Sequence, residues 1–253
     1  MSIIVDPENI VELINGGDHN PYHLLFYMIS NFRMIDYKNP LIYYYPKSSI
    51  SLVEELLELL PENFIRHTEK KHDLYYKPFL PNESFKITRP FFPDWTLPYD
   101  YEFIREIFLG KYYNSLNKGL FIYISREDAK HRRVVNEKEV LEALIPMGFK
   151  KITMTEYNVF TQMNLFSQSD IIISPHGAGL AFMVFGSSKT TLIELNIKCP
   201  ISRHYSHIAW HLEMDYYKLI CKATDDNVDM IVDVQRLVNF LIAHPKLIGF
   251  KKE

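Results

Sequence analysis

Residues 169–180 read Ser-Asp-Ile-Ile-Ile-Ser-Pro-His-Gly-Ala-Gly-Leu. Ile171 to Ile173 form a β-branched run, which is typical of strands buried on both faces of a parallel sheet. The turn that follows is glycine-rich, and residues 180–185 are apolar enough for a buried helix. A strand, a glycine turn and a helix N-terminus predict an anion site, because unpaired backbone N–H groups point at the ligand. The pattern alone is equally compatible with a tight β–α turn that contains a histidine, His176.

Strand and helix patterns alternate along the second half of the chain, on both sides of this turn. Strand patterns occur at residues 120–124, 151–154, 171–173, 191–195 and 216–221, and helix patterns occur at 136–144, 159–166, 180–185, 202–211 and 229–242. This alternation predicts an α/β fold with parallel βαβ units and a doubly wound sheet. Ligands of such sheets bind beyond the carboxyl ends of the strands, so we expect the functional site there.

The first half of the chain gives a less regular pattern. Helices are expected at 7–14, 21–34 and 48–60, the last with Ser51 and Glu54 at capping-box spacing, and strands at 41–45, 64–66 and 74–76. Residues 78–99 combine five prolines with aromatic residues, which indicates an ordered connection rather than a flexible linker. A linking helix is expected at 101–115. We therefore predict a first domain over residues 1–115, including this connection, and a second over residues 116–253.

Composition narrows the class of protein. The 253 residues are 47% hydrophobic and carry a net charge of −3, so they can bury a full core and show no global basic character for nucleic acid. Two cysteines are too few for a disulfide framework. The sequence has neither a signal-peptide pattern nor an apolar run of the ~20 residues that a membrane span needs. A soluble, cytoplasmic protein without membrane insertion and without nucleic acid as a partner is expected.

A cluster of cations follows the strand at residues 120–124. Four basic side chains lie within eight residues of an otherwise slightly acidic chain: Arg126, Lys130, Arg132 and Arg133. Guanidinium groups suit phosphate oxygens, which they often bind with two hydrogen bonds. The alternative is a solvated loop in which Glu127 and Asp128 neutralise these cations. Glu194, at the end of the strand after the glycine turn, is placed either to accept hydrogen bonds from ribose hydroxyls or to cap a neighbouring helix.

Histidines offer two further possibilities. His23 is expected in the first turn of a helix, where it is either a half-buried capping residue or a general base in a cleft. His204, His207 and His211 share one helical face, which is compatible with zinc or with ordinary packing. The glutamate of an H-E-x-x-H motif is missing there, and the sequence contains neither G-x-S-x-G nor a P-loop pattern.

Three blocks of sequence together resemble glycosyltransferase family 61, the DUF563 family. They are Tyr123-Ile124-Ser125-Arg126 with Arg132-Arg133-Val134-Val135-Asn136-Glu137, then residues 169–180, and then Leu192-Ile193-Glu194-Leu195. The order and spacing of the blocks match that family, and the resemblance covers roughly residues 115–200. In the first half only residues 20–26, Asn-Pro-Tyr-His-Leu-Leu-Phe, are similar to the family's aromatic-histidine motif, and Pro21 departs from it.

The resemblance implies a GT-B-like architecture, in which two Rossmann-like α/β domains face a cleft. The first domain would take the acceptor and the second the nucleotide sugar. Residues facing the diphosphate would be Arg126, with Arg132 or Arg133, and then His176, Gly177, Ala178, Gly179 and Leu180, while Glu194 would face the ribose.

The implied reaction is an inverting transfer of a hexose or pentose from a nucleotide sugar to a hydroxyl of a glycan or glycoconjugate. Uridine diphosphate donors are usual for the family, with xylose or N-acetylglucosamine as candidates. The base would come from the first domain, with His23 favoured over Asp18 and His19. No Asp-x-Asp pair occurs, so we expect a metal-independent site and no cofactor besides the donor. The alternative is a non-catalytic module of the same fold that binds a nucleotide or sugar.

Overall fold

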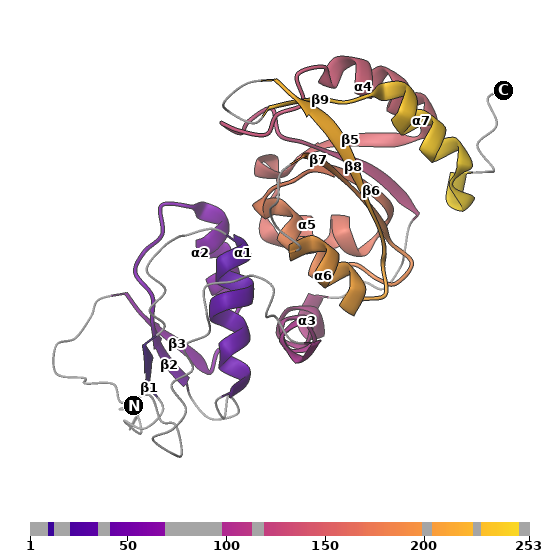
Figure 1. Cartoon of the computed structure of the whole chain (residues 1–253). Coiled ribbons are helices and arrows are strands. Elements are labelled where there is room, and N and C mark those ends of the chain that lie inside the picture. Colours follow the sequence, from indigo (N-terminus) through magenta and orange to yellow (C-terminus); the bar gives the residue numbers. More distant parts are fainter. Residues whose placement is uncertain are drawn as a thin grey trace. The chain divides into compact units, whose positions relative to one another are not determined.

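The computed structural model of the chain describes residues 10–12, 21–34, 41–68, 98–112, 119–198, 204–224 and 229–247. The chain divides into two compact units, Met1–Tyr112 and Tyr113–Glu253, and each unit contains its own sheet (Figure 1). Helices and parallel strands occur in both units, so the α/β class predicted from the sequence is confirmed. The assignment of acceptor and donor to the two units stays a prediction.

The second unit is built on a six-stranded sheet of order β5-β4-β6-β7-β8-β9. All neighbouring strands are parallel except the last pair, which is antiparallel. The isoleucine run of β6 therefore lies inside the sheet, between β4 and β7, as a strand buried on both faces should. The strands are β4 (Leu120–Ser125), β5 (Phe149–Thr153), β6 (Ser169–Pro175), β7 (Thr191–Ile197), β8 (Asp215–Ala223) and β9 (Met230–Ile231).

Helices cover both faces of this sheet, and the alternation of side chains along the strands explains how. Tyr123, Ile173 and Leu195 belong to one cluster of buried side chains that also includes residues of α4 and α7. Their neighbours in sequence point to the opposite face, since successive strand residues alternate. Figure 1 shows α4 (Glu137–Leu144) and α7 (Val234–Ala243) together on one side, with α5 (Val159–Ser167) and α6 (His204–His211) on the other.

The described part of the second unit also contains four 3-10 segments. The longest, η7 (Ala178–Phe185), follows β6 directly and packs against α5 and α6. The apolar run at residues 180–185 thus forms a buried helical segment, although with 3-10 rather than α geometry. The others are η5 (Ile145–Met147), η6 (Met154–Glu156) and η8 (Pro245–Leu247).

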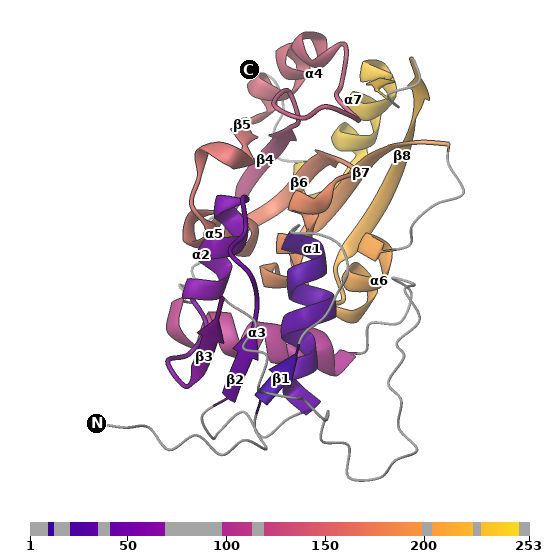
Figure 2. The same ribbon diagram turned by 90° about the vertical axis from the view of Figure 1, so that its left-hand side faces the viewer.

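The first unit contains a three-stranded parallel sheet of order β1-β2-β3, which Figure 2 shows from the side. A single helical run between β1 and β2 passes from α to π to 3-10 geometry, and α3 packs against its last part. The elements are β1 (Ile10–Glu12), α1 (Pro21–His23), η2 (Leu24–Met28), η3 (Ile29–Met34), β2 (Leu41–Tyr44), α2 (Ser51–Glu58), β3 (Phe64–His67) and α3 (Pro98–Tyr112).

Two predicted helices are wrong in part. Residues 10–12 form β1 instead of helix, because Ile10 and Val11 pair with β2 in a parallel ladder. The last helix begins at Val234 rather than at residue 229, because Met230 and Ile231 first pair with β8. In both places pairing with a distant strand overrides the local pattern.

The predicted capping box at Ser51 is also wrong. Helix α2 has Ile50 as its N-cap residue, with no side-chain cap. Glu54 instead accepts a hydrogen bond from the backbone N–H of Ser48 at 2.5 Å and forms an ion pair with Arg66 at 2.7 Å. The strand expected at 74–76 and residues 78–97 of the connection expected over 78–99 lie outside the described residues, while Pro98 and Tyr99 belong to α3.

Candidate functional site

The glycine turn lies at the carboxyl edge of the large sheet, where β6 ends at Pro175 and η7 begins at Ala178. Its shape is fixed by two backbone hydrogen bonds, from His176 N–H to the Leu195 carbonyl at 3.0 Å and from Leu180 N–H to the Gly177 carbonyl at 2.9 Å. The N–H groups of Ala178 and Gly179 have no hydrogen bond to any described residue. Two donors at the start of a helical segment are thus left for a ligand or solvent.

Arg126, from the loop after β4, lies directly against this turn. A Cβ atom added to Gly177 would stand 1.9 Å from the Arg126 Nη1 atom and 2.8 Å from its Cζ atom. The φ angle of Gly177 is 179°, which any residue adopts, so the glycine is required for space and not for backbone conformation. The loop after β4 and the glycine turn are far apart in the sequence, and Arg126 brings them into contact.

No described carboxylate is in direct contact with the Arg126 guanidinium. Within the described ranges this guanidinium forms no ion pair, and it donates hydrogen bonds to the His131 carbonyl at 3.3 and 3.4 Å. Burial and the neighbouring charge of Arg132 lower the pKa of Arg126, which nevertheless stays a cation at neutral pH. A half-buried guanidinium beside a second cation favours an anionic ligand.

His176 is held from behind by Glu194. The His176 Nδ1 atom lies 2.6 Å from the Glu194 Oε1 atom, and the Asn196 side-chain amide donates to the same oxygen at 2.7 Å. The Tyr216 hydroxyl donates to the other oxygen. Burial alone would raise the pKa of Glu194, but the interactions with His176, followed by the hydrogen bond from Tyr216, lower it. The carboxylate therefore holds Nδ1 as the donor, which leaves Nε2 of His176 for a ligand.

Tyr205 of α6 closes the other side of the turn. Its hydroxyl donates to the Gly177 carbonyl at 2.5 Å, and its ring centroid lies 5.1 Å from that of His176. Tyr205 was not among the predicted site residues, because its position relative to the turn depends on how α6 packs against η7.

Arg132 and Arg133 have different surroundings although they are adjacent. Arg132 adopts a φ angle of 62°, which is uncommon outside glycine, and its charge acts on Arg126. Arg133 donates twice to the Asp229 Oδ2 atom, at 2.7 and 2.9 Å, and its backbone N–H donates to Oδ1 at 2.9 Å. The pair borders a pocket of about 300 Å³ lined by Glu127, Arg133, Val134, Val135, Glu137 and Asp229.

A sequence model of the family described as Glycosyltransferase 61 matches residues 26–193, more than half of the chain. The matched segment contains both Arg126 and the glycine turn that Arg126 contacts. The chain belongs to glycosyltransferase family 61. It is therefore a glycosyltransferase, with a sugar donor and an acceptor as its substrates. A search of curated proteins finds no match to this chain.

The residues predicted for the donor side of this glycosyltransferase family 61 chain fall into two groups. The structure brings together Arg126, Arg132, His176 and the turn from Gly177 to Gly179. The other three residues already have protein partners: Leu180 N–H bonds to Gly177, Arg133 to Asp229, and Glu194 to His176. Glu194 is only 1% exposed, and its predicted role toward a ribose stays a prediction.

The three candidates for the catalytic base are Asp18, His19 and His23. Asp18 and His19 lie outside the described residues, and His23 lies in α1 with a side chain that is not described. All three roles stay predictions. In the part of the chain that the structure describes, no group of three or more His, Cys, Asp or Glu side chains is arranged to hold a metal. This holds for His204, His207 and His211 of α6 as well.

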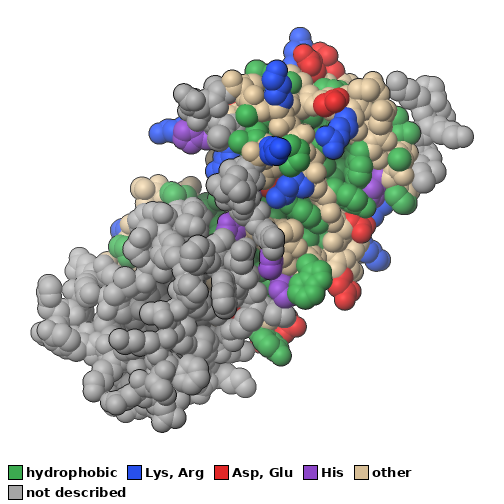
Figure 3. All heavy atoms as spheres, viewed as in Figure 1, with side chains coloured by type: hydrophobic (Ala, Val, Ile, Leu, Met, Phe, Trp, Pro, Cys, Tyr) green, Lys and Arg blue, Asp and Glu red, His purple; other side chains and the backbone are tan. Residues whose placement is uncertain are grey.

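Within the described ranges, none of the helices combines the length and the apolar character required to cross a bilayer. On the face of the second unit seen in Figure 3, lysine and arginine side chains lie among hydrophobic and acidic ones, as a net charge of −3 would suggest.

Proposed function

We propose that the chain is an inverting glycosyltransferase of GT-B architecture whose second unit binds a nucleotide sugar without a metal ion. The observation that carries this proposal is the contact of Arg126 with Gly177, because it joins a cation that has no ion pair with a described residue to a turn with two open N–H donors. Arg126, Arg132 and His176 would face the diphosphate together with the amides of Ala178 and Gly179. The nucleotide that we favour is uridine diphosphate, with xylose or N-acetylglucosamine as the sugar.

The chemistry of transfer fits these groups. The acceptor oxygen forms a bond to the anomeric carbon while the bond from that carbon to the diphosphate oxygen breaks on the opposite face. The base takes the proton of the acceptor hydroxyl, and the nucleoside diphosphate leaves with both bonding electrons. Since negative charge grows on the leaving diphosphate, cations and N–H groups already in place lower the barrier. We assign the base to the first unit, with His23 as the first candidate and Asp18 and His19 next.

A thermal-shift screen of the purified protein against nucleotides and nucleotide sugars, with and without divalent metal ions, tests the donor site. A ligand at a hundredfold its Kd stabilises the folded state by about 2.7 kcal/mol. We expect one nucleoside diphosphate and its sugar to raise the melting temperature equally with and without metal. No shift with any of them would overturn the donor-site proposal.

Turnover separates the enzyme from the non-catalytic alternative. A ligand that stabilises the protein should also be hydrolysed slowly, or transferred once an acceptor is supplied, and the product should have the inverted anomeric configuration. Binding with neither transfer nor hydrolysis would support a nucleotide- or sugar-binding module. A retained configuration would contradict the inverting mechanism.

A further inference from the structure

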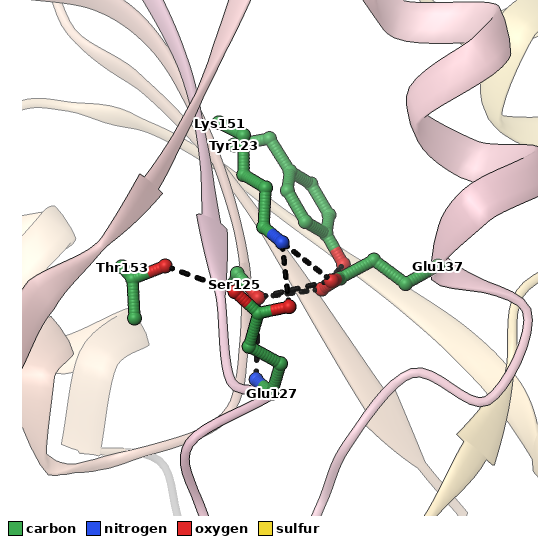
Figure 4. Close-up of polar contacts among 6 residues, drawn as sticks. All are labelled: Tyr123, Ser125, Glu127, Glu137, Lys151 and Thr153. Atoms are coloured by element: carbon green, nitrogen blue, oxygen red, sulfur yellow. Dashed lines mark hydrogen bonds and ion pairs between the residues drawn. The ribbon is translucent and has the colours of Figure 1, made fainter.

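A second cluster of polar side chains is centred on Glu137, at the start of α4, and includes both sequence neighbours of Arg126 (Figure 4). The Glu137 Oε1 atom accepts hydrogen bonds from the Tyr123 hydroxyl at 3.0 Å and the Ser125 hydroxyl at 2.8 Å. Its Oε2 atom lies 3.0 Å from the same Ser125 hydroxyl and 3.3 Å from the Lys151 Nζ atom. Glu137 therefore joins β4, β5 and α4 at the carboxyl edge of the sheet.

Three protein groups donate to the Glu137 carboxylate. An ionised carboxylate offers about four acceptor sites on its two oxygens. The donors are the Tyr123 hydroxyl, the Ser125 hydroxyl, whose single proton the two oxygens share, and Lys151, and the Glu137 side chain is only 14% exposed. Glu137 is thus suited to hold these protein groups in place.

The same lysine fixes a second carboxylate, that of Glu127. Lys151 Nζ lies 2.7 Å from Glu127 Oε2, and the Thr153 hydroxyl lies 3.3 Å from Oε1. The backbone N–H of Glu127 donates to the Ser125 hydroxyl at 3.2 Å. The hydrogen bond from Lys151 lowers the pKa of Glu127, and the same bond raises the pKa of Lys151, so both stay charged near neutral pH.

These contacts hold the residues on both sides of Arg126. Ser125 and Glu127 point to the face that α4 covers, and Arg126 points to the other face, against Gly177. This follows from the alternation of side chains at the end of β4. A backbone fixed at both neighbours leaves Arg126 little freedom except in its own side-chain torsions.

We propose that Glu137 is a positioning residue, which acts through Ser125 to hold Arg126 where it meets the diphosphate of the donor. This inference rests on the proposed function of the Arg126 site. Partly exposed ion pairs such as those of Lys151 with Glu127 and Glu137 contribute little net stability, so the network is better explained by the geometry that it imposes. A charged group that binds a ligand loses affinity when its supporting contacts leave it loosely placed.

Calorimetric titration of inorganic pyrophosphate, a probe without sugar or base, tests this role in Glu137→Gln. The variant keeps the shape of the side chain and loses its charge. We expect its Kd to rise about tenfold in the otherwise native protein and to change little in an Arg126→Ala background, because the two residues then act as one unit. Glu142→Gln is the matched control: it makes the same substitution on the exposed side of α4, where the residue only faces Lys138 at 3.9 Å.

A second pair of variants covers the case in which Glu137→Gln fails to fold. Ser125→Ala removes the hydroxyl that links Glu137 to β4 and is expected to weaken pyrophosphate binding to a similar extent. Ser125→Thr keeps a hydroxyl and is expected to recover most of that loss, a rescue that general loss of packing would not produce.

Three outcomes overturn the inference. An equal pyrophosphate Kd for Glu137→Gln and the native protein overturns the positioning role and leaves the donor site untouched. A tenfold loss of affinity that persists in the Arg126→Ala background does the same. If the native protein binds neither pyrophosphate nor any nucleoside diphosphate, the donor site itself is overturned, and the positioning role with it.

Discussion

Arg126 and Arg133 stand in the same loop after β4, and their surroundings are opposite. Arg133 is paired through two side-chain hydrogen bonds and one backbone hydrogen bond with Asp229, whose side chain is 2% exposed. Arg126 is half-buried against Gly177, beside another cation, and forms no ion pair with a described residue. Arg133 joins the loop to the residue that precedes β9, whereas Arg126 is left to bind a group outside the protein. This cluster of arginines therefore contains one that stabilises the fold and one that is available to a ligand. The two are distinguished by their partners in the structure and not by their place in the sequence.

The largest effect is expected for Arg126→Ala. Loss of this cation should lower kcat/KM for the nucleotide sugar by about 100-fold or more, since it removes a charged donor from the leaving group. The melting temperature without ligand should change little, because no folded-state ion pair is lost among the described residues. Steady-state kinetics and a thermal melt measure the two quantities. Unchanged turnover would remove Arg126 from the donor site.

Arg133→Ala should have the reverse profile. It leaves the Asp229 carboxylate without its main partner, and we expect a loss of about 1–3 kcal/mol in the free energy of unfolding. Its effect on kcat/KM should be smaller than that of Arg126→Ala. Urea denaturation of both variants in parallel provides the comparison. If Arg133→Ala were the more damaging variant for donor kinetics and the less damaging one for stability, the two roles would have to be exchanged.

Gly177→Ala should act on Arg126 without removing it. The new methyl group would displace the guanidinium, which is the far end of a flexible side chain, so we expect donor affinity to fall about tenfold with little loss of stability. Gly179→Ala makes the same change two residues away, where the nearest atom outside the turn, Met154 Cγ, is at an ordinary 3.7 Å. Its effect on donor affinity should be the smaller one. Equal losses would indicate that the turn's flexibility, and not the contact with Arg126, matters.

The smallest expected effect is on the pH dependence of stability. Burial alone would raise the pKa of Asp229, but its hydrogen bonds with Arg133 hold that pKa below the ordinary value of 3.8. A carboxylate with a lowered pKa stabilises the folded state above its unfolded pKa, and this contribution is lost as the pH falls through the folded value. The melting temperature of the native protein should therefore fall more steeply below about pH 4 than that of Asp229→Asn. Parallel slopes from pH 6 to pH 2.5 would contradict this account.

Local pattern was enough to predict most of the second unit. The β-branched run of β6 and the regular alternation around it gave the parallel sheet, and strand ends gave the edge at which Arg126 and His176 meet. The side-chain pairs around the site could not be predicted in this way, because they join residues far apart in the sequence. Asp229 is 96 positions from Arg133, and Tyr216 reaches Glu194 only through the pairing of β7 with β8. Glu137 stood within a recognisable block of sequence, but its hydrogen bonds to Tyr123 and Ser125 require the contact of α4 with β4.

The most direct test of the donor site is an experimental structure of the protein with uridine diphosphate bound. The account predicts that the diphosphate oxygens lie within hydrogen-bond distance of the Arg126 guanidinium, the His176 Nε2 atom and the N–H groups of Ala178 and Gly179. Arg133 should still be paired with Asp229 in that complex. A diphosphate held elsewhere on the second unit, with Arg126 still against Gly177 and no ligand contact, would contradict it.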